Sequence, residues 1–341
     1  SGHGARRVRF PPFATRRQHH ERATAILRPL RILMFARYLP PEYSGAAAQA
    51  FLLAHHLRNR GHEIEFVTQS WTGERHDYEV DGFPVTALHM RLAARHQEFS
   101  VWRSLARHLI RRRKTVDILH GHGAYYTQSI LGPLGRLLGR PTLVKASMSN
   151  NDLSSLSRSA IAPVHRRFLR LIDAYVATSD DLEAERRERG LEADRIWHIP
   201  NGVDTERFHP VDGAARKALA AQLGLPTDRR LALFVGVFDE RKRIQWLAEQ
   251  WIATEGFGSK AMLVAVGPTS REAYGRELRQ SLDHLATKQP QLLAVREYSA
   301  DIQRYYQAAH LLLFPSSKEG LPNAVLEAMA CGLPCVTARA C

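Results

Sequence analysis

Residues 311–334 of the chain, LLLFPSSKEGLPNAVLEAMACGLP, decide the fold that the sequence predicts. The apolar residues at the start of this stretch predict a strand. Pro322 and Asn323 suit the first positions of a helix, and Gly332, followed by another proline, suits its end. The stretch therefore predicts a strand, a loop and a helix, as in an open α/β sheet.

Two carboxylates lie in this stretch, eight positions apart. Glu319 lies on the predicted loop at the carboxyl end of the strand, and Glu327 lies one to two turns into the helix. Ligands bind at this edge of an open α/β sheet, and a helix start offers free N–H groups and a positive dipole end to a phosphate. We expect the two acids to accept hydrogen bonds from sugar or ribose hydroxyls; the alternative is an ordinary surface loop and helix.

The whole string resembles the Glu-x7-Glu signature of the retaining glycosyltransferases of family 4, whose fold is called GT-B. The resemblance implies that Glu319 binds the donor sugar and takes part in catalysis, and that Glu327 binds the ribose of the nucleotide. It also implies that the residues between them contact the sugar and the phosphates of the donor, namely Gly320, Leu321, Pro322 and Asn323.

A second motif follows another predicted strand. The run GVFDERKR, which begins at Gly236, resembles the family's Gly-Arg-Leu-x-x-x-Lys-Gly, whose Arg and Lys bind the donor phosphates. The resemblance implies that Gly236 contacts the donor and that Lys242 is both a donor-binding and a catalytic residue. Val237 stands where the family has its Arg, so we expect Arg241 or Arg243 to supply the lost charge. The alternative is a solvated basic turn.

Candidates on the acceptor side lie in the first half. Gly45 precedes a predicted helix at the family's Gly-Gly, where a glycine lets the backbone approach a ligand. His120 and His122 end a predicted strand and resemble the family's His-x-His, which implies a catalytic His122; hydrogen-bonded sheet-edge histidines or metal ligands are the alternatives. Many relatives have a histidine near Ser147, and here Ser147 and Asp152 are expected to contact acceptor or sugar instead.

The resemblance also implies a mechanism. Family members of this type are thought to use front-side attack, in which the leaving phosphate helps to take the acceptor proton and no protein nucleophile is needed. Basic residues and helix dipoles would then neutralise the leaving diphosphate, so neither a metal nor another cofactor is expected. Asp180 and Asp181 are interpreted as the start of a helix and not as an Asp-x-Asp metal motif.

Strand-like and helix-like segments alternate along the rest of the chain, which predicts parallel sheets with helices on both faces. We expect an α/β fold of two doubly wound, Rossmann-like domains that face a cleft, the second incomplete because family members continue past the equivalent of Val336. The expected order is a disordered basic extension (1–28), an acceptor-side domain (29–200), a linker (201–210) and a donor domain (211–341).

The net charge of +14 lies mostly in the first half of the chain. Residues 1–200 hold 31 Lys and Arg against 19 Asp and Glu, whereas residues 201–341 hold 17 against 15. The predicted helix 98–113 is basic and amphipathic. Either it packs its apolar stripe on the sheet and exposes its charges to water, or it lies on an anionic membrane surface. We expect no nucleic-acid partner, since no binding motif or interleaved aromatic residues accompany the charge.

The remaining composition favours a globular protein. Hydrophobic residues make up 44% and charged residues 24% of the chain, and no apolar stretch approaches the ~18 residues of a membrane span. No apolar signal-peptide core follows the basic start, so we expect a cytoplasmic protein, peripheral at most on the inner face of the membrane. Neither a disulfide framework nor a zinc cluster is expected from the three cysteines, Cys331, Cys335 and Cys341.

The function expected from these motifs is that of a retaining glycosyltransferase. It would move a sugar from a nucleotide-sugar donor to a hydroxyl of a glycan acceptor, such as a lipid-linked or cell-surface precursor. Two alternatives stay open: a nucleotide-sugar epimerase of the same fold, and a non-catalytic membrane or glycan-binding protein. A dinucleotide oxidoreductase is disfavoured because no Gly-x-Gly-x-x-Gly follows the first strand.

Overall fold

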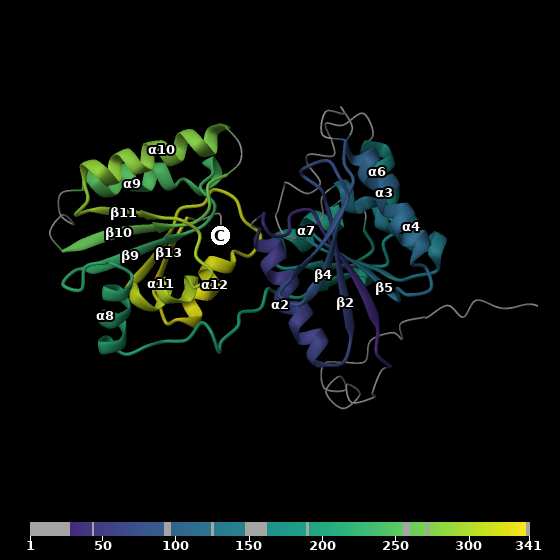
Figure 1. The fold of residues 1–341 in the computed structure, drawn as a ribbon, viewed down its shortest axis with the longest axis horizontal. Coiled ribbons are helices and arrows are strands. Elements are labelled where there is room, and N and C mark those ends of the chain that lie inside the picture. Colours follow the sequence, from purple (N-terminus) through teal and green to yellow (C-terminus); the bar gives the residue numbers. More distant parts are fainter. Residues whose placement is uncertain are drawn as a thin grey trace, which may run out of the picture.

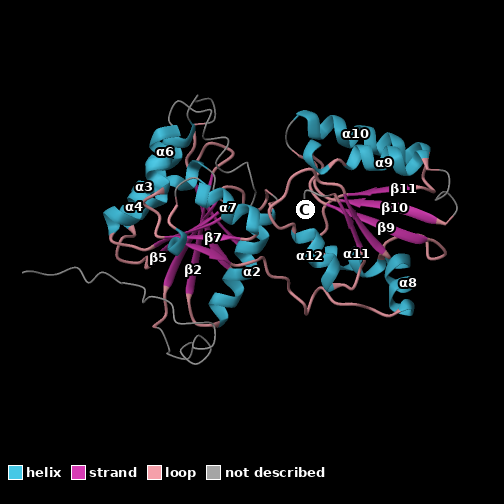
Figure 2. Ribbon diagram, turned by 180° about the vertical axis from the view of Figure 1, so that it is seen from behind, coloured by secondary structure: helices cyan, strands magenta, loops and turns pink. Residues whose placement is uncertain are grey.

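The computed structural model describes residues 28–338, except 43, 92–96, 124–125, 147–161, 189–190, 255–259 and 271–272. These residues form two lobes, each built on one sheet (Figure 1). All but the last residue of the expected basic extension lie outside the described part. Figure 2 shows helices packed on the sheet of each lobe, as the alternating pattern predicts. The expected α/β fold of two doubly wound domains is confirmed.

The sheet of the first lobe has the strand order β3-β4-β2-β1-β5-β6-β7-β8. Neighbouring strands are parallel except for β3, which pairs antiparallel with β4. The sequence analysis did not predict β3, because this edge strand buries none of its residues and so lacks the alternation of apolar and polar residues. The strands are β1 (Arg31–Ala36), β2 (Glu63–Gln69), β3 (His76–Val80), β4 (Phe83–Leu88), β5 (Ile118–His122), β6 (Thr142–Lys145), β7 (Ala174–Ala177) and β8 (Ile196–His198).

Helices cover both faces of this sheet. The helices are α2 (Gly45–Asn59), α3 (Gln97–Arg111), α4 (Leu131–Leu138), α6 (Ala162–Leu169) and α7 (Asp180–Glu188), with 3-10 turns η1 (Tyr126–Ile130) and η2 (Ala193–Arg195). Helix α2 packs on one face through Ala50 and Phe51. On the other face α3 buries Leu105 and Leu109. The apolar stripe of the basic helix therefore packs on the sheet, as the first of the two interpretations expected, while its arginines point outward.

The second lobe has a parallel sheet of order β11-β10-β9-β12-β13. One face packs against α9 and α10, and the other against α8, α11 and α12 (Figure 1). The strands are β9 (Arg230–Val235), β10 (Ala261–Val266), β11 (Leu293–Arg296), β12 (Leu311–Phe314) and β13 (Cys335–Thr337). The helices are α8 (Gly213–Gln222), η3 (Glu240–Lys242), α9 (Ile244–Ala253), α10 (Ala273–Lys288), α11 (Ile302–Ala308) and α12 (Asn323–Ala330).

Besides β3, two further segments differ from the sequence prediction. Helix α8 was missed because it fully buries only Ala220 and so shows no apolar stripe, although Asp212 caps it by accepting from the backbone N–H of Ala215. The helix expected over residues 125–138 is divided into η1 and α4. Within the described residues, no helix combines the length and the apolar character that a bilayer-crossing segment requires.

Candidate active site

A cleft of about 600 Å³ lies between the two lobes. Its walls are the segments that follow β1, β2, β5 and β6 in the first lobe and β9, β10 and β12 in the second. These are the carboxyl ends of parallel strands, where open α/β sheets bind ligands. The two sheets therefore turn their binding edges toward the same space.

On the second-lobe wall, the Glu319 carboxylate binds two cationic side chains. Its Oε1 accepts from Arg241 Nη1 at 2.6 Å, from Lys242 Nζ at 2.7 Å and from Ser316 Oγ at 2.5 Å. The Glu319 side chain is only 11% exposed and that of Lys242 only 10%. Burial lowers the pKa of Lys242, and the Glu319 carboxylate opposes that shift. This wall therefore holds a buried, hydrogen-bonded group of opposite charges.

Arg241 supplies to the cleft the positive charge that the family has at the position of Val237. Of the two arginines expected to replace the family's Arg, Arg241 lines the cleft. Arg243 is exposed and is not among the cleft-lining residues; its left-handed φ of 53° marks the junction between η3 and α9. The lost positive charge is thus restored from a position four residues along the loop.

Glu327 lies deeper in the second lobe and still lines the cleft. The hydroxyl of Tyr306, a fully buried residue of α11, donates to Glu327 Oε2 at 2.8 Å. Burial raises the pKa of Glu327, while the Tyr306 hydrogen bond and the charge of Arg207 act in the opposite direction. Tyr306 therefore both orients this carboxylate and favours its ionised form.

Two helices begin at the cleft. The first turn of α2 lines it with Gly45 and Ala46, and the first turn of α12 lines it with Asn323 and Ala324. Ser44 caps α2 by accepting from the backbone N–H of Ala47. Unpaired N–H groups and positive dipole ends thus face the same space from both lobes, which favours an anionic ligand.

The same residues carry contacts between the lobes. Asn323 Nδ2 donates to the carbonyl of Gly45 at 3.1 Å, and Asn201 Nδ2 donates to Asn323 Oδ1 at 2.9 Å. A Cβ on Gly45 would lie 3.3 Å from Asn323 Nδ2, so the absence of a side chain permits this approach. Gln49 adds a hydrogen bond to the carbonyl of Gly202 at 2.8 Å.

A close backbone approach shapes the cleft beside Gly236. A Cβ on Gly267, which directly follows β10, would lie 1.9 Å from the Gly236 carbonyl oxygen. Any other residue at position 267 would therefore push the loops after β9 and β10 apart. Both loops line the cleft, the second through Pro268 and Thr269.

The first-lobe wall is built differently. His122 ends β5 and lines the cleft, and its register partner on β6 is Lys145, which also lines it. The rings of His120 and His122 lie 4.1 Å apart, and both are buried. Burial and the nearby Lys145 charge lower the pKa of His120 to about 3, and burial with His120 and Lys145 lowers that of His122 well below its usual value. Both histidines are therefore neutral near pH 7.

An aromatic pair extends this wall. The rings of Tyr38 and Trp71 are stacked, with centroids 5.1 Å apart and planes 9° from parallel. The Arg37 guanidinium carbon lies 5.2 Å from the Tyr38 centroid and 5.7 Å from that of Trp71. All of these residues line the cleft. Stacked rings held by a cation form a rigid surface for a ligand.

The structure brings most of the expected site residues to this cleft. The lining residues among them are Gly45, His122, Gly236, Arg241, Lys242, Glu319, Leu321, Pro322, Asn323 and Glu327. His120 and Gly320 are not cleft-lining residues, and Ser147 and Asp152 lie outside the described part of the chain. Residues that the sequence reasoning missed are Arg37, Trp71, Lys145 and Asn201; the available signal was their position at the end of a strand or within three residues after it.

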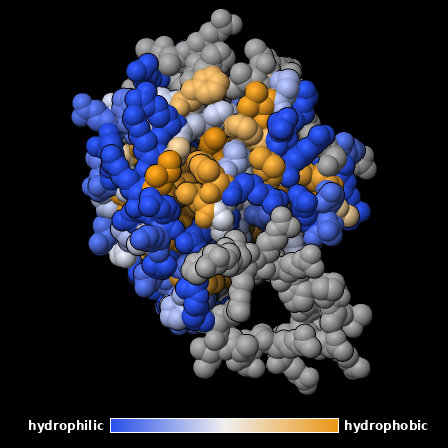
Figure 3. Space-filling model, turned by 90° about the vertical axis from the view of Figure 1, so that its right-hand side faces the viewer, coloured by the Kyte–Doolittle hydropathy of each residue, from blue (hydrophilic) through white to orange (hydrophobic). Residues whose placement is uncertain are grey.

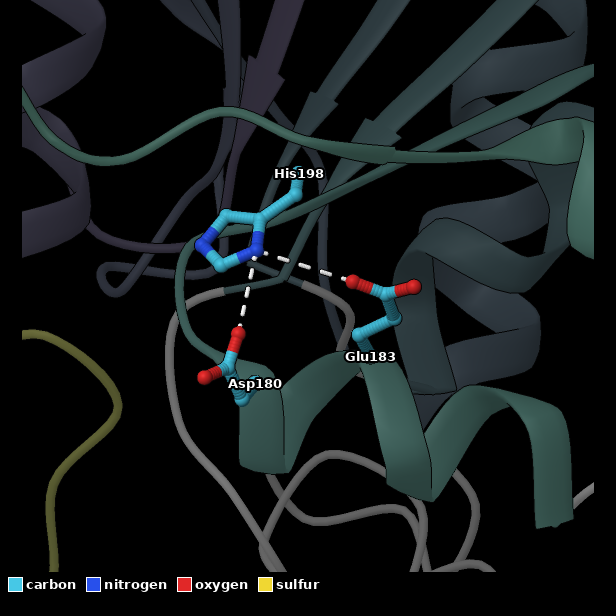
Figure 4. A group of neighbouring side chains, drawn as sticks. All are labelled: Asp180, Glu183 and His198. Carbon is cyan, nitrogen blue, oxygen red and sulfur yellow. Dashed lines mark ion pairs between the residues drawn. The ribbon is translucent and has the colours of Figure 1, made fainter.

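A second group of titratable side chains lies away from the cleft (Figure 4). His198 Nδ1 lies 3.2 Å from Asp180 Oδ1 and 3.6 Å from Glu183 Oε2, close enough for the three residues to share a metal ion. Glu183 also pairs with Arg187 at 2.5 Å, and Asp180 is largely exposed. Since α7 begins at Asp180, as expected from the sequence, these contacts tie the helix to β8 as a surface ion-pair cluster.

Comparison with family models finds two matches along the chain. Residues 44–202 match a glycosyl transferase 4-like domain, and residues 229–341 match the domain of glycosyl transferases group 1. The two matched regions correspond to the two lobes, and most of the cleft residues described above lie within them; Arg37 and Tyr38 precede the first match.

Curated relatives include a D-inositol 3-phosphate glycosyltransferase of Xylanimonas cellulosilytica. It is 31% identical over 238 residues, which cover 65% of this chain and 55% of the relative. The chain thus spans about half the length of such relatives. Alpha-maltose-1-phosphate synthase of Mycolicibacterium smegmatis is 25% identical over 315 residues, 89% of this chain and 78% of the relative.

Solved structures share the fold. The Anabaena HepE structure with UDP and glucose matches with a TM-score of 0.71 at 17% identity, covering 91% of this chain and 81% of that chain. WaaG, a glycosyltransferase involved in lipopolysaccharide biosynthesis, matches with a TM-score of 0.70 at 18% identity, covering 92% and 82%. At these identities the likeness establishes the two-domain fold.

Proposed function

The chain belongs to the GT-B glycosyltransferases that join a 4-like domain to a group 1 domain, and from this premise we propose that it transfers a sugar from a nucleotide-sugar donor to a hydroxyl of an acceptor. The observation that carries the proposal is the cluster of Glu319, Arg241 and Lys242 in a cleft that also contains Glu327. At one sheet edge, two carboxylates can accept hydrogen bonds from sugar hydroxyls, and two cations can bind a diphosphate.

Each part of the donor has a partner in this proposal. Arg241 and Lys242 bind the diphosphate, helped by the first turns of α2 and α12. Glu319 accepts hydrogen bonds from the transferred sugar, and Glu327 accepts them from the ribose. Both cations are engaged by Glu319 in the free cleft, so donor binding exchanges part of that contact for phosphate oxygens.

Transfer then requires the leaving diphosphate to be stabilised as its bond to the sugar breaks. Preorganised cations and helix N–H groups stabilise such developing charge without reorganisation. We propose that Arg241, Lys242 and the two helix starts serve this role in place of a metal or other cofactor, with retention of configuration. His122, neutral and buried at the cleft, orients a hydroxyl of sugar or acceptor through a hydrogen bond. The convergence of these groups on one space supports the assignment.

The outer face of the first lobe supports a membrane-associated acceptor. Helices α3 and α6 both contact η1, and α4 contacts α6. Figure 3, which views this end of the molecule, shows apolar residues gathered in its centre and hydrophilic residues around them. Exposed apolar side chains on these helices are Phe99, Ile110, Leu137 and Val164; exposed cations are Arg103, Arg107, Arg111, Arg136, Arg166 and Arg167.

We therefore propose that this outer basic face binds the cytoplasmic surface of an anionic membrane, where the acceptor is a lipid-linked or cell-surface glycan precursor. A relative from Escherichia coli, 27% identical over 239 residues, is named as a galactosyltransferase acting on a diphosphoundecaprenol-linked sugar. Cations attract anionic lipids, and the interleaved apolar side chains enter the interface.

The test of transfer is an assay of the full-length protein with UDP-, GDP- and ADP-sugars and a panel of glycan acceptors. We expect nucleoside diphosphate to be released only when an acceptor is present. Glu319→Ala and Glu327→Ala should each lower turnover at least about tenfold, ~1.4 kcal/mol of transition-state stabilisation. Conversion of the free donor without an acceptor would instead indicate an epimerase, and donor binding without turnover a binding protein.

The membrane proposal has its own test in vesicle co-sedimentation. We expect binding to vesicles that contain phosphatidylglycerol and not to neutral phosphatidylcholine, with release by salt. The double variant Arg103→Glu/Arg107→Glu should lose this binding, whereas Lys217→Glu/Lys288→Glu, two exposed positions in the second lobe, should retain it. Equal binding by both double variants would contradict a role for the outer basic face.

A further inference from the structure

Lys145 is a cation in the cleft that has no ion pair with the described residues. It is the last residue of β6 and lines the cleft, and its ammonium group has no hydrogen bond or ion pair with the residues that the structure describes. Burial alone lowers its pKa to about 8, so it remains mostly protonated near pH 7. The Lys145 side chain is half-buried, and a cation that faces a cleft without a partner among the described residues is a candidate contact for a charged ligand.

The contrast with the other wall makes this cation distinctive. There, Arg241 and Lys242 share the Glu319 carboxylate at 2.6 and 2.7 Å. Beside Lys145, the register partner is His122, whose lowered pKa keeps it neutral. The neighbouring strand β5 therefore places no carboxylate opposite Lys145. The positive electrostatic potential of Lys145 extends into the cleft.

Further donors lie on the same wall. The register of β1, β5 and β6 aligns Ala36 with His122 and His122 with Lys145, so Arg37 follows β1 at the same sheet edge. Strands about 4.8 Å apart place the backbones of Arg37 and Lys145 roughly 10 Å from each other. In the aromatic pair of the same wall, the buried Trp71 Nε1 has no hydrogen-bond partner among the described residues.

We propose that Lys145 binds a phosphate of the acceptor, with Arg37 as a second cation, so that the acceptor is a phosphorylated sugar or polyol, either free or linked to a lipid. This inference rests on the proposed function. The donor diphosphate already has Arg241, Lys242 and the start of α12 on the second-lobe wall. A phosphate on the first-lobe wall leaves the rest of the acceptor over Trp71 and Tyr38, where the aromatic faces contact its ring.

The test compares acceptors that differ only in a phosphate. The full-length protein is assayed with glucose and glucose 1-phosphate, with inositol and inositol 1-phosphate, and with undecaprenyl diphosphate-linked N-acetylglucosamine in vesicles against its methyl glycoside. The wild-type protein should prefer the phosphorylated member of at least one pair. Preference in a soluble pair identifies a free phosphate ester as the source of the anion, and preference in the vesicle pair alone identifies the lipid diphosphate.

The variant Lys145→Met isolates the cation. We expect it to raise the KM for the phosphorylated acceptor about 30-fold, as expected when one partner of a desolvated charge pair is lost. The KM for any neutral acceptor should change by less than about threefold, and Lys145→Arg should restore most of the loss. Donor affinity, measured by calorimetry with the nucleotide sugar, should stay within about twofold of wild type. Lys114→Met, an exposed lysine of the same lobe, is the matched control.

The outcomes separate the two proposals. Transfer to neutral and phosphorylated acceptors with equal efficiency overturns this inference and leaves the proposed function standing. Weaker donor binding in Lys145→Met also overturns it, because Lys145 would then belong to the donor site. No nucleoside diphosphate release with any acceptor overturns both proposals. If Lys145→Met fails to fold by circular dichroism, Lys145→Gln, which keeps a polar side chain of similar length, replaces it.

Discussion

The two walls of the cleft differ in whether their cations are paired with an acid. On the second-lobe wall, Arg241 and Lys242 are neutralised by Glu319 before any ligand arrives. On the first-lobe wall, Lys145 has no such acid among the residues that the structure describes, and His120 and His122 are kept neutral by burial and by the Lys145 charge. A wall that carries its own counter-charge can hold a donor in one geometry, whereas a wall without one depends on its ligand for compensation.

The walls also differ in how the chain builds them. The charged cluster of the second lobe comes from two short runs, one after β9 and one after β12. The first-lobe wall is assembled from the ends of four strands, β1, β2, β5 and β6, which lie far apart in the sequence. If the proposed function holds, recognition of the donor is concentrated in local sequence and recognition of the acceptor is spread over the lobe, so acceptor preference can vary while the donor site is kept.

The largest effect is expected from removing a donor-side cation. Lys242→Met should lower kcat/KM about 100-fold, ~2.7 kcal/mol, because the diphosphate loses a buried positive charge when its bond to the sugar breaks. Steady-state kinetics with the best donor measure this. Lys260→Met, an exposed lysine of the same lobe, should behave as wild type. A loss below about threefold would mean that Lys242 is a structural partner of Glu319 only.

The next effect concerns the stability of the first lobe. Asp117 is buried and accepts hydrogen bonds from the backbone and side chain of Arg31 and from Arg28. Burial would raise the pKa of Asp117, but these bonds and charges outweigh it and lower the pKa to about 2. Asp117→Asn should destabilise this lobe by about 2 kcal/mol. The matched change Asp283→Asn, at an exposed pair in the second lobe, should cost less than ~1 kcal/mol.

The pH dependence of this contribution follows from its sign. Because the folded pKa of Asp117 lies below the ordinary value near 4, its stabilisation is present above that value and is lost as the pH falls toward 2. Hydrogen exchange followed by mass spectrometry, with peptides assigned to each lobe, should show the first lobe losing stability through this window. Asp117→Asn should lose less over the same range, and identical profiles for variant and wild type would contradict the assignment.

A smaller effect is expected at Glu327. Tyr306→Phe removes the hydrogen bond to its carboxylate, which should weaken nucleotide-sugar binding about fivefold, ~1 kcal/mol. Calorimetry measures this, with Tyr305→Phe as the control on the same helix. The Tyr306 bond lowers the pKa of Glu327, so its loss should raise that pKa further. Donor affinity would then begin to fall at a higher pH during acidification than in the wild type; an unchanged pH profile would show that Glu327 does not bind donor as a carboxylate.

The smallest effect tests the contact between the walls. Gly45→Ala places a methyl group 3.3 Å from Asn323 Nδ2 and should lower kcat/KM about threefold, ~0.7 kcal/mol, by displacing the α2 and α12 starts relative to each other. Gly213→Ala, whose added methyl meets no atom within 4 Å, is the control. Equal kinetics for the two variants would contradict a role for this interlobe contact in catalysis.

The sequence predicted most of the fold and the second-lobe wall. The periodicity of apolar residues, the helix caps and the glycines predicted nearly every strand and helix. The two charged runs contained Glu319, Glu327 and Lys242. It missed β3, which is exposed, and α8, which buries almost nothing. It did not single out Lys145 or Trp71, because a cleft formed by single residues from distant strands leaves no local pattern. Nor did it identify Tyr306, whose partner Glu327 lies 21 positions away.

Calorimetric titration of the full-length protein with nucleotide sugars tests the role of the paired acids most directly. One donor should bind at a single site in the wild-type protein, and its affinity should fall at least about tenfold in both Glu319→Ala and Glu327→Ala. Unaltered affinity in both folded variants, or heat of binding that persists when the cleft is blocked, would contradict the assignment of this cleft as the donor site.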